Sequence, residues 1–221
     1  MAKHRPHVTV KWAQSIDGRV ATKSGTSQWI TGHASRILAH RLRSEHDAVL
    51  VGIGTLLADN PRLTVRLSDG ETPLRVVADT SFRTPPSANI LSEGARGVLI
   101  IGSEQAPVER EQMLAARGAT VRRVPASTAG LDLMSLMAAL SEMGVVSVLV
   151  EGGPRLISEF LRRKLADRAA IFIAPKLVGA GLDAIGDLGM SELEDAIRLE
   201  EPAIEQSGDD LLIRAALRYR N

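Results

Sequence analysis

Residues 148–165, VLVEGGPRLISEFLRRKL, constrain the fold strongly because an apolar strand turns through two glycines directly into a helix. The run 148–150 is aliphatic without alternation, which is typical of a strand covered on both faces. Leucine, isoleucine and phenylalanine then recur at helical spacing from position 156. Gly152 and Gly153 let a ligand approach the backbone, and the start of the following helix favours an anion. The segment therefore predicts a strand, turn and helix that either bind a phosphate or form only a tight connection.

The same alternation of short apolar runs and amphipathic stretches continues along the chain, which favours a mostly parallel sheet covered by helices. The predicted strands are residues 8–13, 48–51, 74–78, 97–101, 120–124, 146–150 and 169–174. The predicted helices are residues 32–45, 108–116, 131–143 and 154–165, and residues 56–60 begin like a short helix. Residues 197–217 instead predict two strands around a turn at 206–209, a C-terminal hairpin with an antiparallel edge. We expect one α/β domain spanning residues 1–221, with helices on both faces of its central sheet.

Composition excludes several classes of function. The chain has 221 residues, of which 44% are hydrophobic, and this length suits a single compact domain. Its formal net charge is +1 and no basic block interleaves with aromatic residues, so neither nucleic acid nor an anionic membrane is expected as a partner. No apolar run approaches the roughly 20 residues of a spanning helix and no hydrophobic signal core is present, so we expect a cytoplasmic protein. The absence of cysteine removes disulfides, thiolate catalysis and zinc–thiolate sites, and we expect no metal.

Polar loops follow several predicted strands, at the edge where an open α/β sheet binds ligands. Residues 15–31 carry Trp29 among hydroxyls and amides, which fits a cofactor-embracing loop. They also fit a surface excursion with Trp29 in the core and Asp17-Gly18 as a simple turn. The stretch 52–55, Gly-Ile-Gly-Thr, resembles part of a dinucleotide fingerprint but lacks the third glycine of GxGxxG. It offers a second glycine-rich backbone site at a strand end.

Two further loops carry charged or hydroxyl side chains. In residues 58–66 an aspartate and two arginines flank Leu63, and arginine can bind a phosphate through two hydrogen bonds. The same charges would also suit a solvated loop with an internal Asp–Arg pair. Residues 79–83 form a hydroxyl-rich turn that either contacts a ligand or only stabilises itself.

Lys11 interrupts the apolar strand predicted at residues 8–13. An unpaired ammonium is costly to bury. Lys11 is therefore expected either to face solvent or to meet an anionic or carbonyl-bearing ligand.

Six segments, taken in order, resemble the riboflavin-pathway pyrimidine reductases over nearly the whole chain. They are VKWAQSIDGRVA, SGTSQWIT, LRSEHDAVLVGIGTLLADNPRLTVR, PLRVVADTS, VLVEGGPRLISEFL and APKLVGAG. The resemblance implies a dihydrofolate-reductase-like fold, NADPH as the cofactor, a homodimer, and reduction of the ribosyl group of a phosphoribosylaminopyrimidine to a ribityl chain. Many such proteins carry an N-terminal zinc deaminase domain. This chain lacks the His/Cys/Cys signature of that domain, so we expect a reductase domain alone.

The resemblance also assigns site residues. The positions matched to NADPH contacts are Ala13, Trp29, Thr55, Asp59, Thr80, Gly153, Pro154, Arg155, Leu156, Ile157, Ser158 and Glu159. The positions matched to substrate contacts are Lys11, Ser27, Arg43, Leu63, Arg66 and Glu151. Arg43 and Arg66 would take the 5′-phosphate, and Glu151 would accept from the ribose hydroxyls or the pyrimidine amino groups. The candidates for the 2′-phosphate of NADPH are Arg19, Arg36 and Arg155.

We hypothesise that the ribosylamine opens to an imine or carbonyl at C1′, which then receives hydride from the cofactor. Lys11 would donate to the developing charge, and Asp59 or Glu151 would relay protons, so these three form the expected catalytic set. Two alternatives stay open. One is a reductase of the same fold acting on the still-diaminated pyrimidine or another pterin-like substrate. The other is a non-catalytic nucleotide-binding partner of a deaminase.

Overall fold

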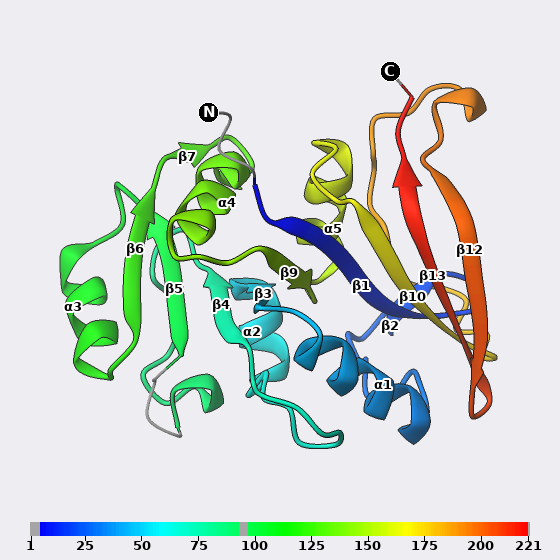
Figure 1. Cartoon of the computed structure of the whole chain (residues 1–221), viewed down its shortest axis with the longest axis horizontal. Coiled ribbons are helices and arrows are strands. Elements are labelled where there is room, and N and C mark those ends of the chain that lie inside the picture. Colours follow the sequence, from blue (N-terminus) through cyan, green and yellow to red (C-terminus); the bar gives the residue numbers. More distant parts are fainter. Residues whose placement is uncertain (1–4, 93–96, 221) are drawn as a thin grey trace. The chain divides into compact units, whose positions relative to one another are not determined.

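The structure, a computed structural model, describes residues 5–92 and 97–220 (Figure 1). The chain forms two compact units, which we call unit 1 (Met1–His7 and Arg43–Val148) and unit 2 (Val8–Leu42 and Leu149–Asn221). Among the described residues no helix is long and apolar enough to cross a membrane.

Unit 1 is built on parallel strands. They lie in the order β3 (Ala48–Gly52), β4 (Leu74–Ala78), β5 (Val98–Ser103) and β6 (Thr120–Val124). Its helices are α2 (Ile53–Asp59), η1 (Asn89–Leu91), α3 (Val108–Ala116) and α4 (Leu133–Glu142), and β7 (Ala126–Ser127) pairs with β8 (Gly130–Leu131). Consecutive residues of β3 and β5 are buried, as expected for strands covered on both faces. The apolar core around them includes Leu56, Phe82, Ile90 and Leu114.

Unit 2 combines a parallel pair with the C-terminal hairpin. Strand β1 (His7–Ser15) runs parallel to β10 (Arg168–Ala174), which pairs antiparallel with β13 (Asp210–Arg218), and β13 pairs antiparallel with β12 (Arg198–Ser207). Its helices are α1 (His33–Ser44), α5 (Pro154–Arg162) and η2 (Leu193–Asp195), and β2 (Arg19–Thr22) pairs with β11 (Gly181–Asp183). Strand β9 (Ser147–Val150) leads into α5. The core between α1 and the strands includes Ala39, Leu42, Phe172 and Leu212.

A buried polar network ties the start of α1 to the hairpin turn. The carboxylate of Asp210, which is 3% exposed, accepts hydrogen bonds from the backbone N–H of Gly32 at 2.7 Å and from Ser35 Oγ at 2.6 Å. Ser35 Oγ also lies 3.1 Å from Ser207 Oγ. A carboxylate at a helix N-terminus is stabilised by the helix dipole and by the N–H groups there. The network therefore fixes the helix that directly follows the Trp29 loop.

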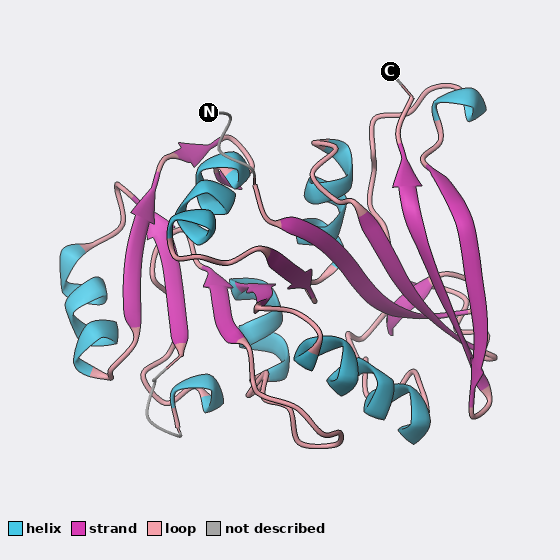
Figure 2. Ribbon diagram, viewed as in Figure 1, coloured by secondary structure: helices cyan, strands magenta, loops and turns pink. Residues whose placement is uncertain are grey.

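Most of the predicted elements are present, and Figure 2 shows helices and strands alternating along the chain. The predicted α/β fold, with a mostly parallel sheet and a C-terminal antiparallel hairpin, is confirmed. Helix α5 ends at Arg162 instead of residue 165, and α1 begins at His33. The short strands β2, β7, β8 and β11 were not predicted, because two to four residues carry too little periodicity to be recognised. A single domain over residues 1–221 stays a prediction.

Candidate active site

Lys11 and Glu151 form an ion pair in unit 2. Lys11 lies within β1, and Glu151 directly follows β9. Lys11 Nζ lies 3.7 Å from Glu151 Oε2, and the two side chains are 16% and 8% exposed. Lys11 Nζ also lies 5.4 Å from the centre of the Phe172 ring. The sequence left open which group Lys11 contacts, and the structure shows that it contacts a carboxylate of the protein itself, that of Glu151. Desolvating two opposite charges costs free energy, so a largely buried pair of this kind is a candidate functional site.

Trp29 lies on the surface of unit 2. Its side chain is 64% exposed, so the interpretation that placed it in the core is wrong. The Arg36 guanidinium lies 4.5 Å from the centre of the indole ring, and Arg36 Nη1 donates to the Thr31 carbonyl at 3.2 Å. Lys176 Nζ donates to the carbonyls of Trp29 at 2.9 Å and of Ile30 at 2.7 Å. An exposed indole held in place in this way can stack on a planar ligand.

A cavity of about 160 Å³ lies beside Trp29. It is lined by Ser27, Trp29, Ile30, Lys176 and Val178, together with residues of β1 and β2. A protein cavity of about 150 Å³ is large enough for benzene. One six-membered ring, but not a whole dinucleotide, would therefore fit it. The lining of the cavity includes Ser27, whose position is matched to substrate contacts, and Trp29, whose position is matched to NADPH contacts.

Asp17 fixes the loop on the other side of this cavity. Its carboxylate accepts hydrogen bonds from Ser15 Oγ at 2.5 Å, Val178 N at 3.1 Å and Gly179 N at 2.7 Å. These bonds, the one from Ser15 first, lower the pKa of Asp17 from 3.8 to about 2. The Asp17-Gly18 segment is thus more than a simple turn, because it connects β1 to the loop after β10. Sequence reasoning did not assign this role to Asp17.

Replacing Asp17 with asparagine is expected to lower the melting temperature at neutral pH, since an amide cannot accept these hydrogen bonds as a carboxylate does. A group whose pKa is lowered in the folded state stabilises it above the unfolded pKa and loses this effect as pH falls through the folded pKa. The gap between wild type and variant should therefore be full above about pH 4 and shrink as the pH falls towards 2. Thermal unfolding of wild type and Asp17→Asn between about pH 2 and pH 7 measures the difference in melting temperature. Asp69→Asn, an exposed carboxylate in another loop, is the control; a gap that did not change with pH would contradict the prediction.

Helix α5 begins at the glycine turn. Gly153 is its N-cap without a side-chain hydrogen bond, and Pro154 occupies the first turn. An N-terminus without a capping side chain favours an anion, as the glycine turn predicted. This helix start fits the phosphates of a dinucleotide.

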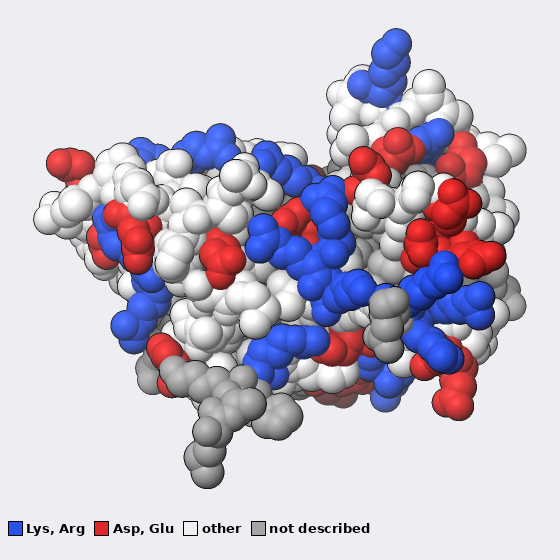
Figure 3. All heavy atoms as spheres, turned by 90° about the horizontal axis from the view of Figure 1, so that it is seen from above, with Lys and Arg blue, Asp and Glu red and all other residues white. Residues whose placement is uncertain are grey.

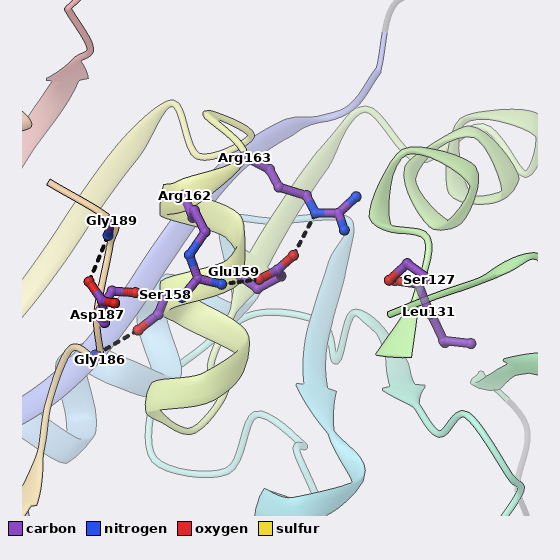
Figure 4. Close-up of polar contacts among 9 residues, drawn as sticks. All are labelled: Ser127, Leu131, Ser158, Glu159, Arg162, Arg163, Gly186, Asp187 and Gly189. Atoms are coloured by element: carbon purple, nitrogen blue, oxygen red, sulfur yellow. Dashed lines mark hydrogen bonds and ion pairs between the residues drawn. The ribbon is translucent and has the colours of Figure 1, made fainter. Parts of the chain in front are cut away.

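The later residues of the run 153–159 are held by internal contacts. Ile157 and Ser158 are buried, and Ser158 Oγ accepts from Gly186 N at 2.8 Å. Glu159 pairs with Arg162 Nη1 at 2.6 Å and Arg163 Nε at 2.5 Å (Figure 4). The Ser158 bond links the helix to the loop at Gly186, whereas the two Glu159 pairs lie within the helix and its C-cap. The assignment of these positions to NADPH stays a prediction.

In unit 1, Arg43 and Arg66 meet at one residue. Arg43 Nη1 donates to the Thr64 carbonyl at 3.1 Å, and Arg66 Nη1 donates to Thr64 Oγ1 at 3.2 Å. Leu63, which directly precedes Thr64, is 3% exposed and has a φ of 57°, in the left-handed region. Two guanidinium groups converging on a neutral residue form a positively charged point that suits a phosphate.

The unit 1 positions matched to NADPH follow β3 and β4. Thr55 and Asp59 lie in α2, whose N-cap Gly52 has no side-chain hydrogen bond. Desolvation by neighbouring atoms raises the pKa of Asp59, although the residue is at the surface, where water screens the effect. Thr80 follows β4, and its carbonyl accepts from Ser103 N at 3.0 Å.

The turn after Thr80 is held by the buried Asp79. Asp79 Oδ2 accepts from Thr84 N at 2.7 Å and from Thr84 Oγ1 at 2.8 Å. The hydroxyl-rich turn is therefore stabilised from inside by a carboxylate that the sequence analysis did not single out.

The assigned residues divide between the units. Those of unit 2 are Lys11, Ala13, Ser27, Trp29, Glu151 and the run 153–159, and those of unit 1 are Arg43, Thr55, Asp59, Leu63, Arg66 and Thr80. Within unit 2 Lys11 pairs with Glu151, and within unit 1 Arg43 and Arg66 both donate to Thr64. In the described part of the chain no group of three or more histidine, aspartate or glutamate side chains could hold a metal ion. Acidic and basic side chains are interspersed on the face shown in Figure 3.

Comparison with known proteins identifies the relatives. The RibD C-terminal domain family matches residues 6–213. The riboflavin biosynthesis protein RibD of Aquifex aeolicus is 38% identical over 214 residues, which cover 96% of this chain and 58% of that protein. The 2,5-diamino-6-ribosylamino-4(3H)-pyrimidinone 5′-phosphate reductase of Methanothermobacter thermautotrophicus is 40% identical over 215 residues, covering 95% of this chain and 97% of that protein.

The solved structure of Acinetobacter baumannii RibD superposes with a TM-score of 0.84 at 30% identity, covering 97% of this chain and 58% of that one. The chain thus spans little more than half the length of the RibD proteins it matches. The match also confirms the dihydrofolate-reductase-like class of fold that the sequence motifs implied. Motifs, fold and family match agree: the chain belongs to the RibD C-terminal domain family.

Proposed function

We propose that this protein is an oxidoreductase of riboflavin biosynthesis that uses NADPH to reduce 5-amino-6-(5-phosphoribosylamino)uracil to its ribitylamino product. The observation that carries the proposal is the largely buried Lys11–Glu151 pair, at two positions matched to substrate contacts. Membership of the RibD C-terminal domain family supports it. So does the reductase of Methanothermobacter thermautotrophicus, which this chain matches over 97% of that enzyme's length.

The substrate phosphate would bind at Arg43 and Arg66. Both guanidinium groups donate to Thr64, through Nη1 in each case. A guanidinium carries five N–H donors, so each arginine can hold Thr64 and donate to a phosphate oxygen as well. The internal hydrogen bonds would orient both groups before the ligand arrives, which reduces the entropy lost on binding.

The pyrimidine ribosyl group would react next to Lys11 and Glu151. Lys11 would donate a proton or hydrogen bond to the oxygen that leaves C1′ when the ribosyl ring opens. Glu151 would hold the ammonium in place and accept from a ribose hydroxyl or a pyrimidine amino group. The pair places an ammonium donor beside a carboxylate in a largely buried position. Asp59 is the second candidate for a proton relay.

Bound NADPH would supply the hydride that reduces C1′. The residues present fit such a group in unit 2, because Trp29 offers an exposed aromatic face and α5 begins without a capping side chain. Gly153, Pro154 and Arg155 would hold phosphates, and Trp29 would contact a ring of the dinucleotide. We expect NADPH to be preferred over NADH, with Arg19, Arg36 or Arg155 as the ligand of the 2′-phosphate.

A steady-state assay tests this function. The purified protein is given the deaminated or the still-diaminated phosphoribosylaminopyrimidine, with either NADPH or NADH. Oxidation of the cofactor is followed as the loss of its absorbance at about 340 nm. We expect turnover of the deaminated substrate, a higher kcat/KM with NADPH, and a large loss when the substrate lacks its 5′-phosphate. Tight binding of NADPH without turnover of either pyrimidine would contradict the proposal and support a nucleotide-binding partner of a deaminase.

The diaminated pyrimidine is the second candidate substrate. The name of the Methanothermobacter thermautotrophicus reductase gives a 2,5-diamino-pyrimidinone phosphate as its substrate, and that enzyme is 40% identical to this chain. A higher kcat/KM for the diaminated compound in the same assay would select this alternative.

We further propose a cytoplasmic homodimer. Strand β12 is the edge of its sheet, and Ile204 on this strand is 63% exposed. Pro202 and the charged side chains of this strand oppose pairing through its backbone, so the exposed Leu199 and Ile204 are the side chains that would pack against a second copy. Sedimentation equilibrium of the purified protein would measure its oligomeric state, and a monomer at micromolar concentration would contradict the proposed dimer.

A further inference from the structure

We propose that Lys176 is a positioning residue that holds Trp29 in the conformation that binds the nicotinamide cofactor. The inference rests on the proposed function, because it takes Trp29 to be a cofactor contact. It adds a residue that neither the sequence motifs nor the family match assigns a role.

The backbone around Lys176 is fixed on both sides. Lys176 N donates to the Ala174 carbonyl at 2.8 Å, and the Lys176 carbonyl accepts from Ile16 N at 3.1 Å. Directly after it, Val178 N and Gly179 N donate to the Asp17 carboxylate. The ammonium of Lys176 is therefore attached to a segment whose own position is determined by polar contacts with the end of β1 and the turn that follows it.

The Trp29 segment is not held by burial. Trp29 is 64% exposed, and residues 23–32 contain neither helix nor strand. Lys176 Nζ donates to two successive carbonyls there, Trp29 at 2.9 Å and Ile30 at 2.7 Å. Two bonds to neighbouring peptide groups fix both the place and the orientation of the backbone. The indole ring follows, since Arg36 stacks on it from α1 at 4.5 Å.

The same side chain lines the cavity of about 160 Å³ with Ser27 and Trp29. Replacing Lys176 would remove one of the residues that line this cavity and would also remove the hydrogen bonds that hold the Trp29 loop. Hydrogen bonds from a charged donor are stronger than neutral ones, but both partners here are near water, which screens them. We therefore expect removal of the ammonium to weaken cofactor binding about tenfold without unfolding the protein.

The test uses Lys176→Met in the full chain, with Lys164→Met as the matched control. Lys164 is also a surface lysine of unit 2 whose Nζ donates to a backbone carbonyl, that of Arg220 at 2.7 Å. Both changes are made in wild type and in a Trp12→Phe background, which leaves Trp29 as the only tryptophan because the chain has 2. The readouts are the Kd for NADPH from titration, KM and kcat from the assay above, the fluorescence anisotropy of Trp29 without ligand, and the melting temperature.

For Lys176→Met we expect lower Trp29 anisotropy, a Kd and KM for NADPH raised about tenfold, a smaller change in kcat, and a nearly unchanged melting temperature. Lys176→Arg should recover part of the affinity, and Lys164→Met should match wild type. Unchanged anisotropy, or lowered anisotropy with unchanged Kd for NADPH, would overturn the proposal. Should Trp12→Phe fail to fold, the Kd measured in the wild-type background by NADPH fluorescence decides alone.

Failure of the proposed function is distinguishable from failure of this inference. A wild-type protein that binds NADPH but turns over neither pyrimidine would refute the proposed reaction. The effect of Lys176→Met on anisotropy and on the Kd for NADPH would still decide the role of Lys176.

Discussion

Lys11→Met is expected to lower kcat for pyrimidine reduction about 100-fold or more, which is the range found for removal of a positioned acid or base. The Lys11 ammonium pairs with Glu151, a carboxylate at a substrate-matched position, at 3.7 Å. Methionine keeps the length and apolar stem of the side chain but removes the donor. Steady-state kinetics with the phosphoribosyl substrate measures the effect.

A double variant separates chemistry from folding. Lys11→Met alone removes a cation from beside the largely buried Glu151 carboxylate, and loss of a neighbouring opposite charge destabilises a buried carboxylate. Adding Glu151→Gln removes that charge, so Lys11→Met/Glu151→Gln should recover much of the lost stability while staying inactive. Lys164→Met controls for the loss of one lysine. A wild-type rate in Lys11→Met, or recovery of activity together with stability in the double variant, would show that Lys11 has no catalytic role.

Gly102→Ala is expected to destabilise the protein by about 3 kcal/mol, at the upper end of the usual range for overpacking. A Cβ at position 102 would lie 2.3 Å from Phe82 Cε1 and 2.4 Å from Phe82 Cζ. The Phe82 ring is fully buried in the core of unit 1, so it has no free space to move into. Urea denaturation of variant and wild type gives the difference in the free energy of unfolding.

Two further variants make this prediction specific. Gly54→Ala is the matched control, because a Cβ there meets no atom within 4 Å and alanine favours the helix. Phe82→Leu removes part of the ring and is destabilising by itself. In the double variant Gly102→Ala/Phe82→Leu the added methyl should fill part of the vacated space, so the two effects should sum to less than their separate values. Strict additivity would contradict the clash.

Much of the fold could be predicted from the sequence because the signals are local. The strands at residues 74–78 and 120–124 have the predicted boundaries. The first is mostly aliphatic, and the second carries β-branched residues at 120, 121 and 124 around two arginines. The hairpin at the C-terminus followed from its polar turn in the same way. Strands β2 and β11 were missed because their three or four residues are stabilised by pairing with each other, and no pattern within either one reports that pairing.

For the candidate site, the sequence motifs predicted positions, and the contacts that those residues make came only from the structure. Trp29 was placed in a polar loop correctly, but its contacts with Arg36 of α1 and with Lys176 of the loop after β10 could not be seen in the sequence. In the sequence, Asp17 had the pattern of a turn residue. The N–H groups that donate hydrogen bonds to its carboxylate lie after β10, far along the chain. A side chain whose partners are distant in sequence carries no local signal of its role.

The sequence by itself determined the class of fold, the strand–glycine–helix unit at residues 148–165 and the family, because periodicity, turn chemistry and motif order are properties of neighbouring residues. Only the tertiary structure decided that Lys11 meets Glu151, that Arg43 and Arg66 converge on Thr64, and that Lys176 holds the Trp29 loop. These contacts join side chains from separate elements. Their formation depends on how each chain segment packs in its unit, and the free energy of that packing is spread over the whole core.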